Sequence, residues 1–458
     1  MNTASSLTRY IDDNLSSFTD DLIEWLKIPS ISTLPEHKAD VHKAGQWVNN
    51  KLKTTGFPET ELIETEGHPL VYGQWLVDPA QPTLLIYGHY DVQPADPLEL
   101  WNSPPFEPVI ENGNLYARGA SDDKGQVMLV IAALKAWAEV AGGPPINIKV
   151  LFEGEEEAGG ASIAAYVTKN QKKLAADAVL ICDTHMPSPE QPSLITGLRG
   201  LIYTELKVTG SKTDLHSGSY GGVAPNPIHA LCLMISQLKT ADGTIQIPEL
   251  QAAISQPTAA EKKFYLEDPL NIEQALCSEM GISELVGEQN FPALERLGAR
   301  PTFEVHGIAG GFTADGAKTV IPAEATAKIS LRLPPSFNPD EVFGWLEKRV
   351  GQLAPAGYTV TISNIHAGSG VNVDQNNRFF QEAILSLENT FNKTPALLKE
   401  GGSIPIAALF DEELKTPVVL MGFALPDDNI HAPNEKFNLQ QFSRGMKTVA
   451  DYLGRLQV

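Results

Sequence analysis

Apolar residues near the N-terminus recur with the spacing of one buried helix face. They lie at steps of three and four within residues 7–26, at Leu7, Ile11, Leu15, Phe18, Leu22, Trp25 and Leu26. Side chains three and four residues apart share one face of an α-helix, and Pro29 ends the pattern. The segment therefore predicts a helix that docks on the core through this face.

Four short apolar runs further along the chain have the pattern of strands that are buried on both faces. They are TLLIY (83–87), INIKVLF (146–152), AVLIC (178–182) and PVVLM (417–421). Between the first two lies GQVMLVIAALKAWAEVAG (125–142), whose length and composition suit the crossover helix that joins two parallel strands. These features predict an α/β fold with a mixed, largely parallel sheet flanked by helices.

Two later segments alternate apolar and polar residues, as strands with one solvated face do. They are YTELKVTG (203–210) and ATAKISLRL (325–333), and they predict an open antiparallel sheet. At 458 residues the chain exceeds the usual size of a single core, and the buried-strand pattern returns only near the C-terminus. We therefore expect a first domain in two parts, 1–199 and 371–458, with an α+β domain, 200–370, inserted between them.

The chain is strongly acidic, with 56 Asp and Glu against 34 Lys and Arg and a formal charge of −22. Such a balance repels phosphate backbones and anionic lipid heads, so we expect no binding to nucleic acid or to membranes. The excess of acidic residues has two interpretations. It is either a well-solvated surface or, in part, a set of carboxylates gathered around metal ions.

The cysteines and the N-terminus favour a soluble protein of a reducing compartment. Cys182, Cys232 and Cys277 are widely spaced, form no CxxC pair and are odd in number, which argues against a disulfide framework. The first residues, MNTASSLTRYIDDNL, contain no apolar signal core, and no apolar run is long enough to span a bilayer. We predict a cytoplasmic protein.

Residues that can bind metal follow three of the predicted buried strands. TLLIY is followed by His89 and Asp91, INIKVLF is followed by EGEEEAGG (153–160), and AVLIC is followed by Asp183. Ligands of open α/β sheets bind beyond the carboxyl ends of the strands, so these residues can share one crevice.

Two further candidates are Asp122, in a turn before the crossover helix, and His431, in a loop after the last strand. Taken singly, a His or Asp at a strand end is more often a capping or core residue than a ligand. Together, two His with several Asp and Glu suit zinc, manganese or cobalt, and one carboxylate can bridge two ions. The residues alone leave open which glutamate of EGEEEAGG does chemistry.

Eight segments resemble, in their order, a co-catalytic metallopeptidase family that contains aminoacylase, glutamate carboxypeptidase and carnosinase. They are GHYDVQP, LYARGASDDKGQ, FEGEEEAGG, DLHSGSYGG, GAKTVIPAE, SLRLPP, EGGSIPI and HAPNEKF. The chain is most similar to the branch of cytosolic nonspecific dipeptidase and carnosinase. The resemblance implies a homodimeric hydrolase of dipeptides or short peptides with a free C-terminal carboxylate. The inserted domain would be its lid and dimerisation domain.

The resemblance also implies roles for the candidate residues of the first domain. Two divalent ions per subunit, zinc or manganese, would be held by His89, Asp122 and Asp183 for one ion and by Asp122, Glu157 and His431 for the other. Asp91 would hold the imidazole of His89 from behind, and Glu156 would be the general base. A purely structural interpretation of Glu156 stays open.

Four residues of the later segments are expected at the substrate. His216 resembles a family histidine that crosses a dimer interface to stabilise the oxyanion, and Arg332 resembles an arginine that clamps the substrate carboxylate. Ser403 and His366 are candidates for the same carboxylate pocket. The alternatives are a hydrogen bond of His216 within a Gly-rich turn and a surface salt bridge of Arg332. We interpret His306 as structural.

Two other functions fit the same residues. An N-acyl amino acid deacylase of the aminoacylase type would use the same chemistry, because its substrates also carry an amide next to a carboxylate. A noncatalytic metal-binding or interaction protein would need no general base, so the presence of Glu156 with every implied ligand argues against it. We predict a dipeptidase in which water activated by Glu156 attacks the scissile carbonyl and the C-terminal amino acid is released.

Overall fold

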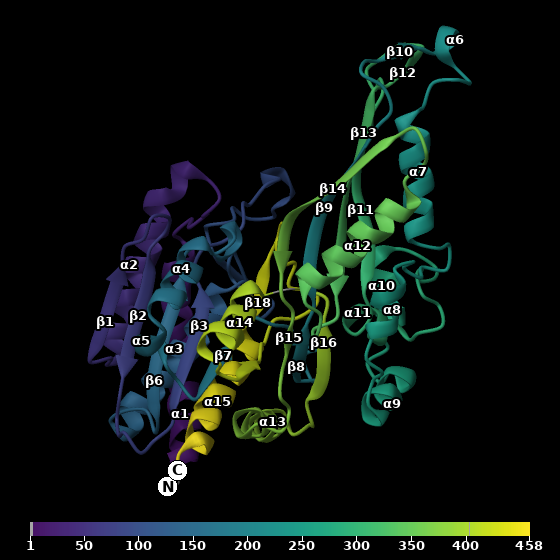
Figure 1. Ribbon diagram of the computed structural model, residues 1–458. Helices are drawn as coiled ribbons and strands as arrows, with labels where there is room; N and C mark the ends of the chain where they lie inside the picture. Colours follow the sequence, from purple (N-terminus) through teal and green to yellow (C-terminus); the bar gives the residue numbers. More distant parts are fainter. Residues whose placement is uncertain (1–2, 403) are drawn as a thin grey trace. The chain divides into compact units, whose positions relative to one another are not determined.

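The computed structural model describes residues 3–402 and 404–458, and it divides into two compact units (Figure 1). Unit 1 comprises Met1–Thr196, Val373–Leu398 and Leu409–Val458. Unit 2 comprises Gly197–Asn372 and Lys399–Ala408. The roles of catalytic domain and lid stay a prediction, as do the domain borders expected from the sequence.

Unit 1 is built on a mixed sheet whose central strands are parallel. β3 (Thr83–His89) pairs in parallel with β6 (Asn147–Glu153) and with β7 (Ala178–Ile181), and β7 pairs in parallel with β17 (Val418–Leu420). The four predicted buried strands are therefore present, and β6 and β7 are buried along their whole length. Further strands complete the order β1-β2-β6-β3-β7-β17-β8, namely β1 (Glu59–Ile63), β2 (Leu70–Trp75) and β8 (Ser193–Leu198), to which β16 (Ala396–Glu400) pairs.

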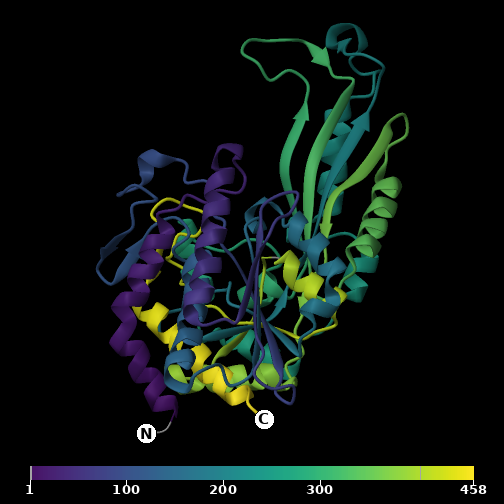
Figure 2. The ribbon, with the colours of Figure 1, turned by 90° about the vertical axis from the view of Figure 1, so that its left-hand side faces the viewer.

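Helices pack against this sheet and against one another, which confirms the predicted α/β class. The predicted N-terminal helix is α1 (Thr3–Leu26), and the predicted crossover helix is α3 (Lys124–Ala141), which is buried along most of its length. α1 and α15 (Leu439–Leu456) both contact α3 and lie side by side (Figure 2). The other helices of unit 1 are α2 (Lys38–Thr55), α4 (Ala161–Lys169), α5 (Gln171–Leu174) and α13 (Arg378–Phe391).

Short elements form the loops around this sheet. A small sheet has the order β18-β5-β4, from β4 (Val109–Glu111), β5 (Asn114–Tyr116) and β18 (Lys436–Asn438). The single helical turns are η1 (Pro35–His37), η2 (Leu98–Leu100), η3 (Glu156–Ala158) and the π-helical turn η4 (Phe410–Leu414). The helix that precedes η4, α14 (Pro405–Leu409), belongs to unit 2 except for its last residue. Across residues 3–402 and 404–458, no helix has both the length and the apolar character that a bilayer span requires.

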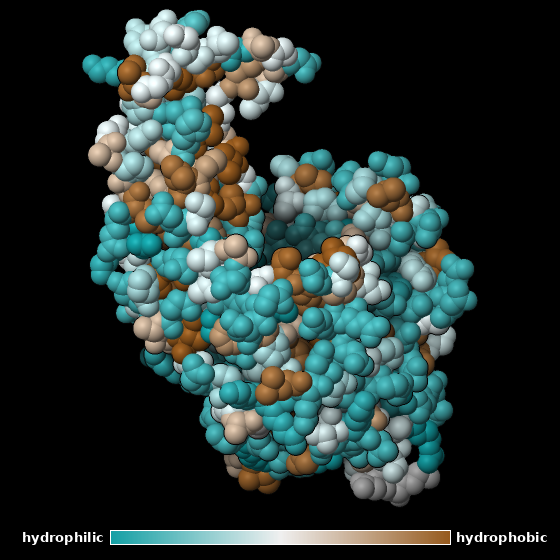
Figure 3. Space-filling view, turned by 90° about the vertical axis from the view of Figure 1, so that its right-hand side faces the viewer, coloured by the Kyte–Doolittle hydropathy of each residue, from teal (hydrophilic) through white to brown (hydrophobic). Residues whose placement is uncertain are grey.

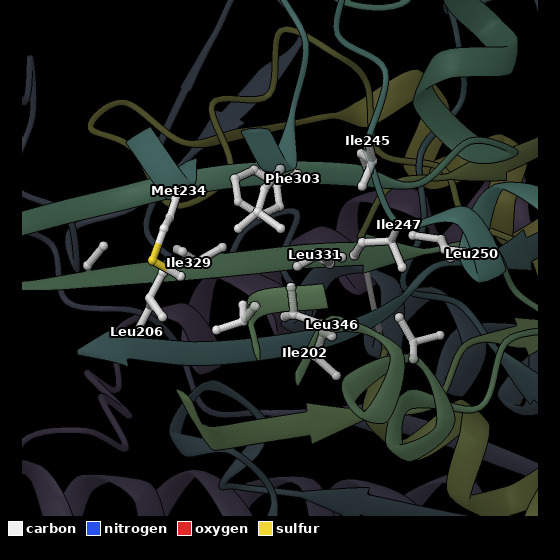
Figure 4. Close-up of a cluster of buried hydrophobic side chains, with 14 of the residues drawn as sticks. Ile202, Leu206, Met234, Ile245, Ile247, Leu250, Phe303, Ile329, Leu331 and Leu346 are labelled. Atoms are coloured by element: carbon white, nitrogen blue, oxygen red, sulfur yellow. The ribbon is translucent and has the colours of Figure 1, made fainter. Parts of the chain in front are cut away.

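Unit 2 contains the antiparallel sheet that the alternating segments predict. Its order is β11-β13-β9-β14, from β9 (Gly200–Thr209), β11 (Thr302–Gly310), β13 (Glu324–Leu333) and β14 (Thr359–Gly368). Residues of β9 alternate between buried and partly exposed. The buried face packs with α7 (Pro227–Leu238) and α12 (Pro339–Leu353) around a core that includes Ile202, Leu206, Met234, Ile329, Leu331 and Leu346 (Figure 4).

The remaining elements of unit 2 are short. They are β10 (Leu215–His216) with its partner β12 (Val320–Ile321), α6 (Ser217–Tyr220), α8 (Pro248–Ala253), α9 (Ala259–Glu267), α10 (Ile272–Met280), α11 (Ala293–Gly298) and β15 (Val371–Asn372). Hydrophobic side chains also reach the surface of unit 2 (Figure 3). Leu233, Ile308 and Ile365 are 59%, 53% and 54% exposed.

Gly422, just after β17, packs directly on the backbone that follows Asp183. A Cβ at residue 422 would lie 1.9 Å from the carbonyl oxygen of Thr184 and 2.5 Å from its nitrogen. Because backbone atoms at the end of a buried strand have little room to move, we expect Gly422→Ala to lower the free energy of unfolding by about 1–3 kcal/mol. Urea unfolding measures this loss.

The control for Gly422→Ala is Gly351→Ala in α12, where an added Cβ would meet no atom within 4 Å. Alanine is the better helix former, so this substitution should leave stability unchanged or raise it slightly. An equal loss of stability in both variants would contradict the steric explanation.

Candidate metal centre and active site

Parallel pairing brings the ends of three strands to one edge of the sheet in unit 1. β3 ends at His89, which lies opposite Glu153 at the end of β6, and the turn η3 (Glu156–Ala158) follows directly. β7, on the other side of β3, ends two residues before Asp183. Because carboxyl ends of parallel strands meet at one sheet edge, side chains that follow them converge there.

The first cluster at this edge consists of His89, Asp122 and Asp183, whose possible ligand atoms lie within 4.8 Å of one another. The Nε2 atom of His89 is 3.0 Å from Oδ1 of Asp122 and 3.9 Å from Oδ2 of Asp183. Its Nδ1 atom lies 3.2 Å from the backbone oxygen of Asp91, to which it can donate. This contact leaves Nε2 directed at the two carboxylates, the orientation that a metal-binding imidazole requires.

The second cluster consists of Asp122, Glu157 and His431, again with possible ligand atoms within 4.8 Å of one another. The Nε2 atom of His431 is 2.8 Å from Oδ2 of Asp122 and 3.2 Å from Oε1 of Glu157. His431 has φ 61°, a left-handed conformation that non-glycine residues adopt rarely. The two oxygens of Asp122 thus face different histidines, which is the arrangement of a carboxylate between two ions.

The electrostatics of the clusters fit divalent cations. Burial and neighbouring carboxylates raise the pKa of Asp183 well above its usual range, although the charge of His89 opposes this. Burial also opposes ionisation of Asp122, but hydrogen bonds from His431 and His89 hold its pKa below the usual range. Three carboxylates and two imidazoles gather at this sheet edge, and of the five side chains only that of His431 is largely exposed. They leave an excess of negative charge, and metal ions are a common way to balance it. The donor set of imidazole and carboxylate suits zinc or manganese.

The four glutamates of residues 153–157 point to different partners. Glu153 is buried and accepts a hydrogen bond from the hydroxyl of Tyr87 at 2.6 Å. Glu155 accepts from the backbone N–H of Ser162 at 3.2 Å. Only Glu157 is a member of a cluster.

Glu156 lies close enough to both clusters to feel their charges. Its pKa is raised to about 7, because burial raises it most, the charge of His89 opposes the rise, and the carboxylates of Glu157 and Asp122 add to it. A carboxyl group with a pKa near neutrality can both take up and release a proton at physiological pH. The geometry is therefore consistent with Glu156 as base and Glu157 as ligand.

The carboxylate of Asp91 has a contact that the sequence did not predict. Its Oδ1 accepts from the backbone N–H of Glu156 at 3.2 Å, and its Oδ2 accepts from that of Glu157 at 3.0 Å. Oδ1 also lies 3.5 Å from Nδ1 of His89. Since Asp91 is fully buried, its side chain fixes the start of η3 as well as the back of the imidazole.

Glu435 is a fully buried residue whose role the sequence analysis missed. Its Oε2 accepts from Nη1 of Arg118 at 2.7 Å and from the N–H of Gly119 at 2.9 Å. Its Oε1 accepts from the N–H groups of Ser121 and Asp122 at 3.0 and 3.2 Å. One side chain thus holds the loop that carries Asp122.

We expect Glu435→Gln to reduce metal affinity or kcat/KM by about 10- to 100-fold, the usual range for a residue that supports a ligand. Each oxygen of Glu435 accepts two donors, so an amide in either orientation leaves two of the four without an acceptor. Metal titration and dipeptide kinetics measure the effect. Glu190→Gln, at an exposed carboxylate that also pairs with an arginine, should leave both unchanged. An equal effect in both variants would contradict the positioning role.

The predicted substrate residues lie in unit 2. The side chain of His216 accepts a hydrogen bond from the N–H of Gly218 at 3.0 Å, which is the turn contact considered as its structural alternative. Arg332 is partly exposed between the buried Leu331 and Leu333, as the alternation along β13 predicts, and His366 is exposed on β14. Ser403 lies outside the described residues.

Arg199, which the sequence analysis did not select, is a buried cation close to Arg332. Its guanidinium donates to backbone oxygens of Gly401, Arg296 and Arg300 at 3.4–3.5 Å. Burial, and then the charge of Arg332, lowers the pKa of Arg199 to about 10. Two neighbouring cations beside a glycine loop are consistent with a subsite for an anionic group.

An α/β unit with two histidine–carboxylate clusters at the carboxyl ends of its strands is the arrangement expected of a metal-dependent hydrolase. The sequence matches the model of Peptidase family M20/M25/M40 over residues 85–455. Since this match covers most of the chain, the protein belongs to that family. The resemblance inferred from the eight segments is thereby confirmed.

Individual relatives are similar over nearly their whole length. The chain is 30% identical to the Cys-Gly metallodipeptidase dug1 of Schizosaccharomyces pombe, over 98% of both chains. It is 28% identical to the Beta-Ala-His dipeptidase of Rattus norvegicus, over 98% of this chain and 95% of that one. The solved structure of the metallo-carboxypeptidase Sso-CP2 from Sulfolobus solfataricus is similar with a TM-score of 0.83 and 31% identity, over 96% of this chain and 99% of that one.

Proposed function

We propose that this protein is a cytoplasmic, metal-dependent dipeptidase that releases the C-terminal amino acid from dipeptides or short peptides. Membership of the peptidase family and the dipeptidases among its relatives support this function, as the sequence predicts. The observation that carries the proposal is the position of Asp122, whose two oxygens face His89 and His431. A noncatalytic metal-binding protein could have such clusters but would need no general base beside them, so Glu156 next to the ligand Glu157 favours an enzyme.

Two divalent ions per subunit, zinc or manganese, would be held by the two clusters, where they would polarise the scissile carbonyl and acidify the attacking water. The bound imidazoles must be neutral, and the contact of His89 Nδ1 with the backbone oxygen of Asp91 favours the tautomer whose Nε2 is free to bind. Asp91 would also keep Glu156 and Glu157 in place through their N–H groups.

Glu156 would take the proton from the attacking water and deliver it to the amine of the leaving amino acid. Its neighbour Glu157 is directed at the second cluster, so adjacent residues of one turn have separate tasks. The pKa of Glu156, which burial above all raises to about 7, suits a group that must accept and then donate a proton near neutral pH.

The substrate's terminal carboxylate would be held by Arg332, with Ser403 and His366 in the same pocket. His216 would stabilise the developing oxyanion from the partner subunit of a homodimer. Exposed apolar residues of unit 2, such as Leu233 and Val223, are consistent with a surface that another copy covers.

The first test of the proposal strips the purified protein with a chelator and restores zinc or manganese in separate samples. Each sample receives a pool of dipeptides and N-acetyl amino acids, whose loss is followed by mass spectrometry. Metal-dependent loss of dipeptides supports the proposal and identifies the active metal. Loss of only the N-acetyl compounds would favour a deacylase, and no turnover with either metal would overturn the proposal.

A further inference from the structure

Four polar and aromatic side chains form a row across the sheet of unit 2. Ser330 on β13 lies directly opposite Tyr203 on β9, and Tyr203 lies opposite His366 on β14. Directly opposed residues of an antiparallel pair project from the same face. His306 on β11 joins the row, because its Nε2 is 2.7 Å from the hydroxyl of Ser330.

The two histidines of the row occupy irregular positions in their strands. The pairing of β11 with β13 shifts register between Val305 and Gly307, around His306. The pairing of β14 with β9 shifts between Asn364 and His366. Bulges of this kind re-aim a side chain and are frequent beside active sites. Both outer strands therefore depart from regular pairing where they present an imidazole to this face.

The centre of the row is a pair of stacked rings. The rings of Tyr203 and His306 have centroids 5.2 Å apart and planes inclined by only 13°, although β13 lies between their strands. The small side chain of Ser330 lets them meet, and its hydroxyl fixes the imidazole. Neither ring belongs to the apolar core, which is formed by the opposite side chains of the same strands.

Arg332 is on the same face, two residues beyond Ser330 along β13 and opposite Leu201. Side chains at this spacing are about 6.7 Å apart along a strand. The proposed carboxylate clamp and the stacked rings are therefore neighbours within one rigid sheet. A dipeptide whose carboxylate binds Arg332 would bring the side chain of its C-terminal residue within reach of the row.

We propose that the stacked Tyr203 and His306 form a subsite for the C-terminal side chain of the substrate, beside the carboxylate pocket of Arg332 and His366, and that this subsite selects planar aromatic or imidazole rings. The inference rests on the proposed dipeptidase function and on Arg332 as the clamp. A flat ring can stack on the Tyr203–His306 pair while the substrate carboxylate is held next to it by Arg332 and His366. Tyr203 and His306 are thus specificity-determining residues rather than structural ones.

The test compares kcat/KM for Ala-Gly, Ala-Leu, Ala-Phe and Ala-His in the metal-loaded enzyme. The wild type should prefer the two ring-bearing substrates to Ala-Leu and Ala-Gly. Tyr203→Ala should reduce that preference by about 3- to 10-fold, the range expected for the loss of one aromatic pair. Tyr203→Phe keeps the ring and should keep the preference. If Tyr203→Ala does not fold, His306→Ala tests the same stacked pair, because His306 is exposed and its replacement should not disturb the core.

The matched control is Lys207→Ala. Lys207 lies on the same face of β9, four residues from Tyr203 and about 13 Å away along the strand, and it pairs with Glu324. The substitution Lys207→Ala should leave kcat/KM unchanged for all four dipeptides. An unaltered preference in Tyr203→Ala and His306→Ala, or an equal fall for all four substrates, would overturn the subsite. A wild type that hydrolyses none of the four would instead overturn the dipeptidase function, and the subsite with it.

Discussion

Replacing Glu156 by Gln should lower kcat by about a thousandfold, the middle of the range for loss of a general base. The amide keeps the shape of the side chain but cannot take the proton of the attacking water. Because Glu156 is in neither donor cluster, metal content should stay the same, as should the affinity for substrate. Steady-state kinetics with a dipeptide give kcat and KM, and metal analysis of the same sample gives the metal content.

The neighbouring residue provides the control for this prediction. Glu155→Gln changes the same kind of side chain one position earlier, at a residue that contacts Ser162 rather than the clusters. It should keep nearly full activity. Loss of metal from Glu156→Gln would mean that Glu156 is a ligand, and a fall in Glu155→Gln as large as in Glu156→Gln would show that the turn itself is sensitive.

The core elements of both units could be predicted from the sequence because their burial leaves a direct pattern. β6 and β7 are covered on both faces and read as continuous apolar runs, and β9 alternates because only one of its faces is covered. α1 buries one face only, so its apolar residues recur at steps of three and four. The short helices α8, α9 and α10 gave no such signal, since few of their described residues are buried, and α11 is only six residues long, too short to show a helical period.

The candidate site was predictable to the level of residue types at strand ends, but not to the level of contacts. The resemblance supplied the assignment among the four glutamates, because β6 ends at Glu153 and only the geometry of the following turn separates the others. The sequence did not indicate a role for Glu435, because its partners are mainly backbone N–H groups, which leave no pattern in a sequence.

The row on unit 2 could not be predicted for a different reason. His306, Ser330, Tyr203 and His366 are far apart in the chain, and their alignment depends on strand register and on two irregularities in pairing. Alternation fixes which face a side chain takes in a regular strand, but a bulge reverses that parity. The sequence around His306 therefore could not show that its ring stacks on that of Tyr203.

Replacing Asp122 by Asn should remove both metals and almost all activity, whereas replacing Asp183 by Asn should remove only one metal. Asp122 is the single residue common to both clusters, and each of its oxygens faces a different histidine. The amide of Asn is neutral and has one oxygen, so in either orientation one ion loses a ligand and the other exchanges an anionic ligand for a neutral one, and both sites are weakened.

The matched control for Asp122→Asn is Asp427→Asn, in the loop that leads to His431, where the carboxylate is exposed and pairs with Lys436. Metal analysis of the three variants should give about none, one and two ions per subunit for Asp122→Asn, Asp183→Asn and Asp427→Asn. Activity of Asp122→Asn should fall by about a thousandfold or more, because several kcal/mol of charge stabilisation by the ions is lost. Equal metal content in Asp122→Asn and Asp183→Asn would contradict the bridging position of Asp122, since a residue that serves only one ion should behave as Asp183 does.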